Sequence, residues 1–402
     1  MLKKIFALIL LTLFIPAAAG CTANDGTDAT AADVTFEDGQ STPEGMIIIT
    51  DENGAKLGFI DDRAGFTAVD GGIFYSVVSM KENSYTGDAE YRFFSLKDRT
   101  DFYLGKLENQ GYEAGFARTE LDGKIYALAV KGNPAGDDAV PLLLLDFDPA
   151  NKTMKTHTVS EYGFPYASMT ASGGKLLIMN HEMTKEKEDK IYEFDPGTGT
   201  VKEVLSFESS ADSLRGVCAA DGGFYLLRLK LNNGGENEMY VDRYDANYGK
   251  ISGQPVTDIL AAAITNVRGI SGRGDALNEI GMNVSRFFVA DGRYMIYENF
   301  GLSRVVVDLQ TGETILAKDD NYAVSTGSGA PLIYKVDYDA DNVSEPEIYG
   351  IENGKPKQVP FTPDGALKLI QLVTVSENGT RAILTSDVYP VQKGTGVIRI
   401  IR

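Results

Sequence analysis

The sequence predicts an all-β fold, a seven-bladed β-propeller of four-stranded antiparallel blades whose ring is closed by an N-terminal strand. The first observation is a glycine-containing turn that returns roughly every 50 residues and usually precedes an apolar or aromatic stretch. A strand-bearing repeat of about this length is typical of propellers. The seven turns, which predict seven blades, lie at 70–72, 122–124, 172–174, 221–223, 291–293, 328–330 and 378–380.

The second observation is another polar turn inside several repeats, between two apolar stretches. Asp, Pro, Asn and Gly in these turns supply the backbone angles of a tight hairpin. Each blade is therefore expected to hold two hairpins, with strands a to d running outward from the axis. Examples of the second turn lie within 144–154, 191–201, 306–314 and 349–355.

The ends of the chain complete the ring. The last repeat is one strand short, and the apolar stretches 46–49 and 56–60 precede the first repeat. One of the two is expected to pair with the last repeat and so remove an exposed sheet edge. The sequence leaves open which of them does so.

Residues 172–178, followed by 192–196, resemble a kelch blade. The resemblance implies a propeller architecture over most of the chain and no particular activity. The chain has no Trp, so blades of the WD40 and quinoprotein types, which carry one in each unit, fit poorly.

The first 20 residues read as an export signal, with Lys3 and Lys4 before a short apolar run. The segment from Ala18 to Cys21 resembles a bacterial lipobox. It implies that Cys21 carries lipid and anchors the protein to the extracytoplasmic side of a bacterial cell membrane. Ordinary signal cleavage after Ala19 is the alternative.

The sequence therefore predicts that the chain has three parts. Residues 1–20 are the lipoprotein signal peptide, 21–45 a flexible tether rich in Thr, Ala, Asp and Gly, and 46–402 the propeller. An insertion at about 258–282 lengthens one repeat, and its portion 259–264 is expected to form a short helix.

Composition limits the partners and the chemistry. The formal net charge is −19, which disfavours nucleic acid as a partner. Two histidines, His157 and His181, are too few for a three-histidine metal site and make a Ser/His/Asp triad unfavourable. Cys218 sits in a small apolar stretch and is expected to be a buried core thiol.

One loop resembles the beginning of a calcium site. Asp337, Asp339 and Asp341 occupy every second position of this loop, as the first ligands of a calcium-binding loop do. The loop then departs from the EF-hand pattern, and a solvated acidic loop is the alternative. No other cofactor is expected, and no catalytic residue is assigned.

Loop lengths differ between the two faces of the predicted ring. The connections between strands b and c are long in every blade except the fifth, whereas both hairpin turns are short. Binding residues gather on loops held by a rigid frame, so the long-loop face is the expected site. Residues expected to line its central mouth are Tyr112, Tyr166, Arg215 and Tyr322; packing between blades is the alternative.

The sequence therefore predicts a non-enzymatic binding or interaction module for an unidentified protein or small-molecule ligand. A secreted propeller hydrolase or lyase that acts on a sugar or lactone through axial carboxylates is the alternative. A structural subunit of an envelope assembly is a third possibility.

Overall fold

The computed structural model describes most of the chain from Asp33 onward. The described residues are 33–37, 39–62, 64–80, 86–133, 139–164, 167–182, 188–232, 236–268, 284–299, 303–319, 321–336, 345–363, 365, 367–389, 391 and 395–402, without the side chains at 80, 112–116, 268 and 285. Cys21, Tyr166 and the predicted calcium loop lie outside them.

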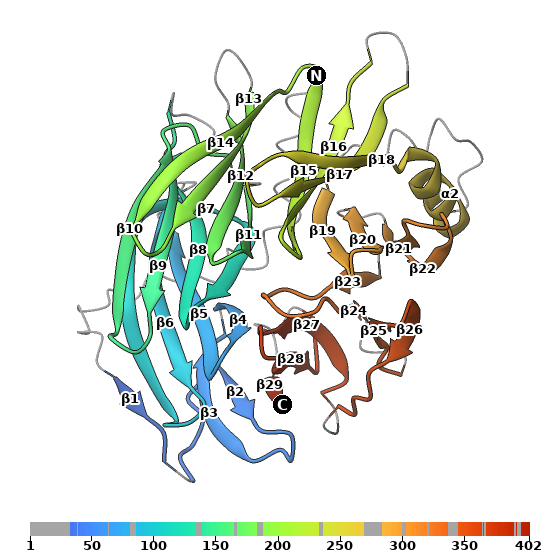
Figure 1. The fold of residues 1–402 in the computed structure, drawn as a ribbon. Coiled ribbons are helices and arrows are strands. Elements are labelled where there is room, and N and C mark those ends of the chain that lie inside the picture. The colour runs from blue at the N-terminus through green and yellow to red at the C-terminus, as the bar shows by residue number, and fades with distance from the viewer. Residues whose placement is uncertain are drawn as a thin grey trace, which may run out of the picture.

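The fold is all-β, built mainly from four-stranded antiparallel units in succession (Figure 1). The first two units share one eight-stranded sheet. Its strands are β1 (Val34–Thr35), β4 (Gly65–Val69), β5 (Gly72–Met80), β6 (Gly87–Ser95), β7 (Thr100–Leu121), β8 (Lys124–Lys131), β9 (Leu142–Asp148) and β10 (Thr153–Ser160).

Three further units follow in chain order as separate four-stranded sheets. The first holds β11 (Ser168–Ser172), β12 (Lys175–Glu182), β13 (Glu188–Asp195) and β14 (Thr200–Glu208). The second holds β15 (Asp212–Ala220), β16 (Gly223–Lys230), β17 (Glu238–Asp245) and β18 (Lys250–Pro255). The third holds β19 (Val284–Ala290), β20 (Tyr294–Asn299), β21 (Ser303–Asp308) and β22 (Thr314–Lys318).

The last two units include both ends of the chain. One sheet holds β23 (Tyr322–Val324), β24 (Ile333–Lys335), β25 (Ile348–Glu352) and β26 (Lys355–Gln358). A five-stranded sheet joins β27 (Leu369–Val375), β28 (Arg381–Ser386) and β29 (Gly396–Ile401) to β2 (Met46–Thr50) and β3 (Lys56–Asp61). Strand β2 runs parallel to β29 and antiparallel to β3, so β2 is the N-terminal strand that pairs with the C-terminal one.

The predicted glycine turns are confirmed as connections between the first and second strands of the units. Asp70 and Gly71, for example, join β4 to β5. Positive φ angles at Gly71 (80°) and Asp122 (53°) are the turn conformations that these residue types tolerate. The turn predicted at 328–330 lies within a longer connection, 325–332, between β23 and β24.

Strand β7 continues through Gln110 and Tyr112 from one four-stranded unit into the next, where separate blades would need a connection. It is one strand from Thr100 to Leu121, which pairs with β6 in its first half and with β8 in its second. Register shifts between Gln110 and Arg118 mark the passage from one unit to the next. The fully buried Gln110 accepts a hydrogen bond from the Tyr91 hydroxyl, which accounts for a polar residue inside a continuous strand.

The first strands of the units form the middle of the molecule, and we call them the inner strands: β4, the second half of β7, β11, β15, β19, β23 and β27. They lie around the centre of Figure 1, with β10, β14, β18 and β26 toward the outside. Inner strand β11 contacts β7 and β15, β15 contacts β19, and β27 contacts β4.

Apolar side chains fill the spaces between neighbouring sheets. The largest of these clusters includes Leu227 and Tyr297 from adjacent sheets, together with Leu260 and Ile264 of helix α2 (Thr257–Arg268). The short helix expected within the insertion is therefore confirmed. It buries one apolar side against the sheets on either side of it.

The ordered structure starts earlier than residue 46. Strand β1 pairs with β7, and Phe36 is buried with its ring 4.4 Å from Phe59 and 5.6 Å from Phe94. Part of the segment expected to be tether therefore contacts the sheets. Among the residues that the structure covers, no helix has the length and apolar character required to cross a membrane.

Candidate ligand-binding site at the inner strands

The two ends of the inner strands differ in how the chain leaves them. At one end, short turns join consecutive strands; we call this the tight-turn side. At the other end, long connections join the second and third strands of six units, and we call this the long-loop side. The exception is the β20–β21 connection of residues 300–302, in agreement with the predicted exception in the fifth blade.

On the tight-turn side, the ends of four inner strands meet around the carboxylate of Glu120, at the end of β7. Its oxygens accept hydrogen bonds from Ser328 Oγ (2.7 Å), from the Glu377 N–H (3.1 Å) and from the Asp70 N–H. These residues follow β23, β27 and β4, so one carboxylate joins the ends of four inner strands. Burial raises the pKa of Glu120 above its ordinary value, although the three donors act in the opposite direction.

Two glycines let the connection before β24 reach this carboxylate. A Cβ on Gly327 would lie 2.1 Å from the Val375 carbonyl oxygen, and one on Gly329 would lie 2.2 Å from that of Ser376. The φ of Gly327 is 101°, a conformation that glycine adopts without a steric penalty. The tight-turn end of β27 is therefore in close backbone contact with this connection.

Arg215 is the exceptional side chain at the inner strands. It sits in an irregularity of β15 between Leu214 and Gly216, where the register to β16 shifts. A Cβ on Gly216 would lie 2.7 Å from the Cβ of Phe287 in β19, so glycine permits close packing beside the irregularity. The strand thus presents Arg215 at a fixed position near the long-loop side.

The Arg215 guanidinium is mostly buried and finds no hydrogen-bond acceptor within the described part of the chain; its Nε is fully buried. Burial lowers its pKa below the ordinary value, with Asp189 as the nearby charge that acts against this shift. Buried guanidinium groups are ordinarily paired, because an isolated charge is costly to remove from water.

The Asp189 carboxylate of β13 fixes the start of β15. It accepts hydrogen bonds from the Leu214 N–H (2.6 Å) and Ser213 Oγ (2.9 Å), and from Ser209 Oγ (2.5 Å). His181 Nδ1 lies 2.8 Å from its other side. Burial acts to raise the pKa of Asp189, but these donors outweigh it and hold the pKa below its ordinary value.

Ser168, on β11, is a second polar group without a hydrogen-bond partner among the described residues, and its Oγ is buried. Thr170, two residues later, accepts a hydrogen bond from the Ala219 N–H of β15 at 3.2 Å. Alternate residues of a strand share one side, so Ser168 also faces β15, nearer to the long-loop side. Ser168 and Arg215 therefore lie on two inner strands that contact each other.

Tyr322 occupies a different place. Its ring is buried, and its hydroxyl lies 2.9 Å from Glu347 Oε2 and 3.1 Å from Lys318 Nζ. Glu347 also accepts a hydrogen bond from Tyr349 at 2.6 Å. Tyr322 on β23 is thus part of a polar contact with β22, apart from the strand that carries Arg215.

The remaining predicted site residues receive no side-chain description. Tyr112 lies within β7 and Tyr166 lies in the connection before β11, with neither side chain among the described ones. The buried thiol expected at Cys218 is confirmed, and burial raises its pKa to about 12. Sequence reasoning missed Glu120 and Ser168, because neither belongs to a motif.

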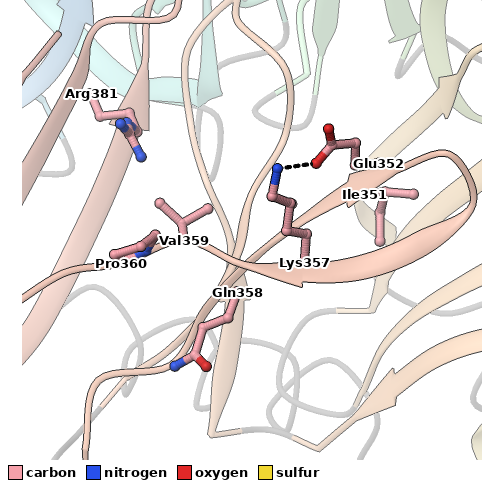
Figure 2. Close-up of a pocket in the computed structure, with 8 residues that line it drawn as sticks. Ile351, Glu352, Lys357, Gln358, Val359, Pro360 and Arg381 are labelled. Carbon is pink, nitrogen blue, oxygen red and sulfur yellow. Dashed lines mark ion pairs between the residues drawn. The ribbon is translucent and has the colours of Figure 1, made fainter.

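Two hollows lie at the outer strands, away from the inner ones. One, of about 320 Å³, is lined by Ile351, Val359 and Pro360 together with the Glu352–Lys357 ion pair, and Arg381 of β28 lies across from them (Figure 2). The other, of about 150 Å³, adjoins the start of α2 at Thr257 and Asp258. In the described ranges, no group of three or more His, Cys, Asp or Glu residues could hold a metal ion.

No family model matches the sequence, and no curated protein matches it. The solved structures similar to the chain include an oligogalacturonate lyase in complex with manganese, at 13% identity and a TM-score of 0.45, covering 92% of this chain and 96% of that one. A putative 6-phosphogluconolactonase from Bacteroides fragilis is 14% identical with a TM-score of 0.43, covering 83% and 94%.

The β-propeller domain of the trilobed protease from Pyrococcus furiosus is 11% identical with a TM-score of 0.41, covering 68% of this chain and 78% of that one. Likeness at this level is distant and identifies neither a ligand nor a reaction.

Proposed function

We propose that this chain is a seven-bladed β-propeller lipoprotein, held on the extracytoplasmic side of a bacterial membrane, that binds its partner or ligand from the long-loop side without catalysing a reaction. The observation that supports it most is the closure at Glu120. Backbone and the Ser328 hydroxyl pack between the tight-turn ends of four inner strands, β4, β7, β23 and β27. The long-loop end, with Arg215 near it, is then the approach to the centre.

The blade count rests on the strand pairing. The eight-stranded sheet contributes two blades that share β7, and four sheets contribute one blade each. The five-stranded sheet supplies the seventh, with β2 as the strand that closes the ring. Contacts of β27 with β4 support this closure, because they join the last inner strand to the first.

The anchor rests on the lipobox resemblance at Cys21. Asp33, where the described structure begins, lies twelve positions after Cys21 in the sequence. A flexible segment of this length has a root-mean-square span of about 17–21 Å, which would keep the propeller close to the membrane. Incorporation of an alkyne-labelled fatty acid into the chain, and its loss in Cys21→Ser, is the expected result.

Photo-crosslinking tests which side binds. A photoreactive amino acid replaces Glu236, exposed in the β16–β17 connection on the long-loop side, or Asn247, exposed in the β17–β18 turn of the same sheet. Crosslinks in intact cells are expected from position 236 and not from 247. Crosslinks from 247 alone would place the partner on the opposite side and contradict the proposal.

The alternative is a hydrolase or lyase that uses axial carboxylates on a sugar or lactone. The carboxylates that the structure describes at the inner strands favour binding over this chemistry. Glu120 and Asp189 each accept several hydrogen bonds that tie strands together, and Glu298 accepts from the Val324 N–H at 3.1 Å and pairs with Arg304 at 2.9 Å. Turnover on a panel of glycosides and lactones would instead support the enzyme.

A further inference from the structure

We infer that the junction between β11 and β15 binds an oxyanion, the carboxylate or phosphate group of a ligand, through the Arg215 guanidinium with the Ser168 hydroxyl as a second donor. The inference rests on the proposed binding function and names the chemistry of its ligand. It is carried by two polar groups on adjacent inner strands, both lacking hydrogen-bond partners among the described residues.

Arg215 differs from other arginines whose side chains join the sheets. Arg118 donates to the Gly65 carbonyl at 3.1 Å and to Ser76 Oγ at 2.9 Å. Arg228 forms an ion pair with Asp242 at 2.5 Å, and Arg304 forms one with Glu298. These groups are neutralised or hydrogen-bonded by their own sheets, whereas Arg215 retains donors for another molecule.

Asp189 does not replace such a ligand. Its oxygens accept hydrogen bonds from Ser209, Ser213 and the Leu214 N–H. Within the described part of the chain no hydrogen bond or ion pair joins Asp189 to Arg215, and the two interact through charge alone. The carboxylate instead holds the backbone beside Arg215 in place. A pre-positioned guanidinium of this kind is suited to oxyanions, because its planar array of N–H groups can bind two oxygens at once.

Ser168 supplies a second hydrogen-bond donor for the oxyanion, from the other strand of the junction. Its neighbour Thr170 is bonded across the junction to Ala219, which fixes the relative positions of β11 and β15. The hydroxyl of Ser168 thus faces the strand that carries Arg215. Donors from two inner strands can converge on one group, and this convergence confers more selectivity than a surface charge.

The overall charge of the chain limits which anions are expected to bind. With a net charge of −19, the protein repels anions at long range. Retention of an anion must therefore come from local contacts, and a ligand with one or two charges fits better than a polyanion.

The test uses the full mature chain with Cys21→Ser, and inorganic phosphate and acetate as separate probes. Thermal unfolding and calorimetric titration are measured at constant ionic strength against sodium chloride. We expect one or both probes to raise the unfolding temperature. Stabilisation by phosphate alone would indicate a phosphate-bearing ligand, and stabilisation by acetate alone would indicate a carboxylate. Stabilisation by both would indicate a site that accepts either group. Each of these three results supports the inference.

Variants separate binding from folding. Arg215→Gln is expected to weaken probe binding at least tenfold, Arg215→Lys to weaken it less, and Ser168→Ala to weaken it several-fold. Arg243→Gln, on β17 of the same sheet, is the matched control and should bind as the parent does. Without probe, Arg215→Gln should unfold at the parental temperature or above it, since it removes an unpaired buried charge.

The inference is wrong if neither probe binds, if chloride stabilises the protein equally, or if Arg215→Gln binds as tightly as the parent. A fall in the probe-free unfolding temperature of Arg215→Gln would instead assign the side chain a structural role. The crosslinking experiment at positions 236 and 247 tests the proposed binding side separately. Failure to bind phosphate or acetate would not contradict the proposed binding side, and failure of the crosslinking would not contradict the oxyanion site.

Discussion

Ser328 donates a hydrogen bond to Glu120 at 2.7 Å, although 208 positions of sequence separate them. The same carboxylate accepts the Glu377 N–H, 257 positions away. A single side chain therefore links an early inner strand to two late ones, at the end of the molecule that carries the tight turns.

Replacement of Glu120 by Ala should be strongly destabilising. It leaves the Ser328 hydroxyl and two backbone N–H groups without an acceptor, at a cost of about 2–4 kcal/mol in the free energy of unfolding. Denaturant unfolding followed by fluorescence measures it. Glu313→Ala, in an exposed turn, is the control and should change stability little; equal stability of the two variants would refute the role given to Glu120.

Asp189 should give the protein an acid-sensitive junction between β13 and β15. Its pKa is held below the ordinary value, so its stabilising contribution is present above about pH 4 and is lost as the pH falls through the folded-state pKa. The stability difference between the parent and Asp189→Asn should therefore shrink as the pH falls below about pH 4.

Thr170→Val, which removes an uncharged hydrogen bond between β11 and β15, provides the comparison for Asp189. Its stability difference from the parent should not change across the same pH range. A difference for Asp189→Asn that stays constant down to pH 3 would show that the carboxylate does not act as described.

Phe36 should hold the segment before β2 against the sheets. Phe36→Ala removes a buried ring that contacts Phe59 and Phe94, with an expected loss of about 3 kcal/mol and faster proteolysis within residues 33–45. Mass spectrometry of limited digests locates the cuts. Val34→Ala, at a side chain with 41% exposure, should leave the digestion pattern unchanged.

Gly327 should tolerate substitution far less than Gly379. Both have positive φ, 101° and 87°, but a Cβ at 327 meets the Val375 carbonyl oxygen whereas one at 379 meets nothing within 4 Å. Gly379→Ala should cost about 1 kcal/mol, and Gly327→Ala clearly more. Comparable unfolding temperatures for the two variants would contradict the close approach of the 325–332 connection to β27.

The sequence predicted the features that depend on neighbouring residues. Glycine and aspartate turns such as Asp221–Gly222 mark hairpins because the backbone angles of the turn require them. The apolar stretch from Ile259 predicted part of α2 for the same local reason.

Contacts between residues far apart in the sequence could not be predicted in this way. Phe36 lies in a segment whose composition is that of a tether, and its burial depends on a pocket made by Phe59 and Phe94. Glu120 and Ser168 are ordinary residues whose importance arises from strands distant in sequence. Arg215 was expected at a central mouth, but only the structure shows that its guanidinium lacks a partner among the described residues.

The hydrogen bond from the Ala68 N–H to Thr374 Oγ1 spans 306 positions and has a consequence for the order of assembly. During synthesis β2, β3 and β4 emerge first, yet two of their partners, β27 and β29, are made last. The early strands therefore keep an unpaired edge until the last strands are made. Contacts of such large sequence separation also slow folding. A chain that stops before Gly396 would leave β2 unpaired on that side, a state prone to association with other chains.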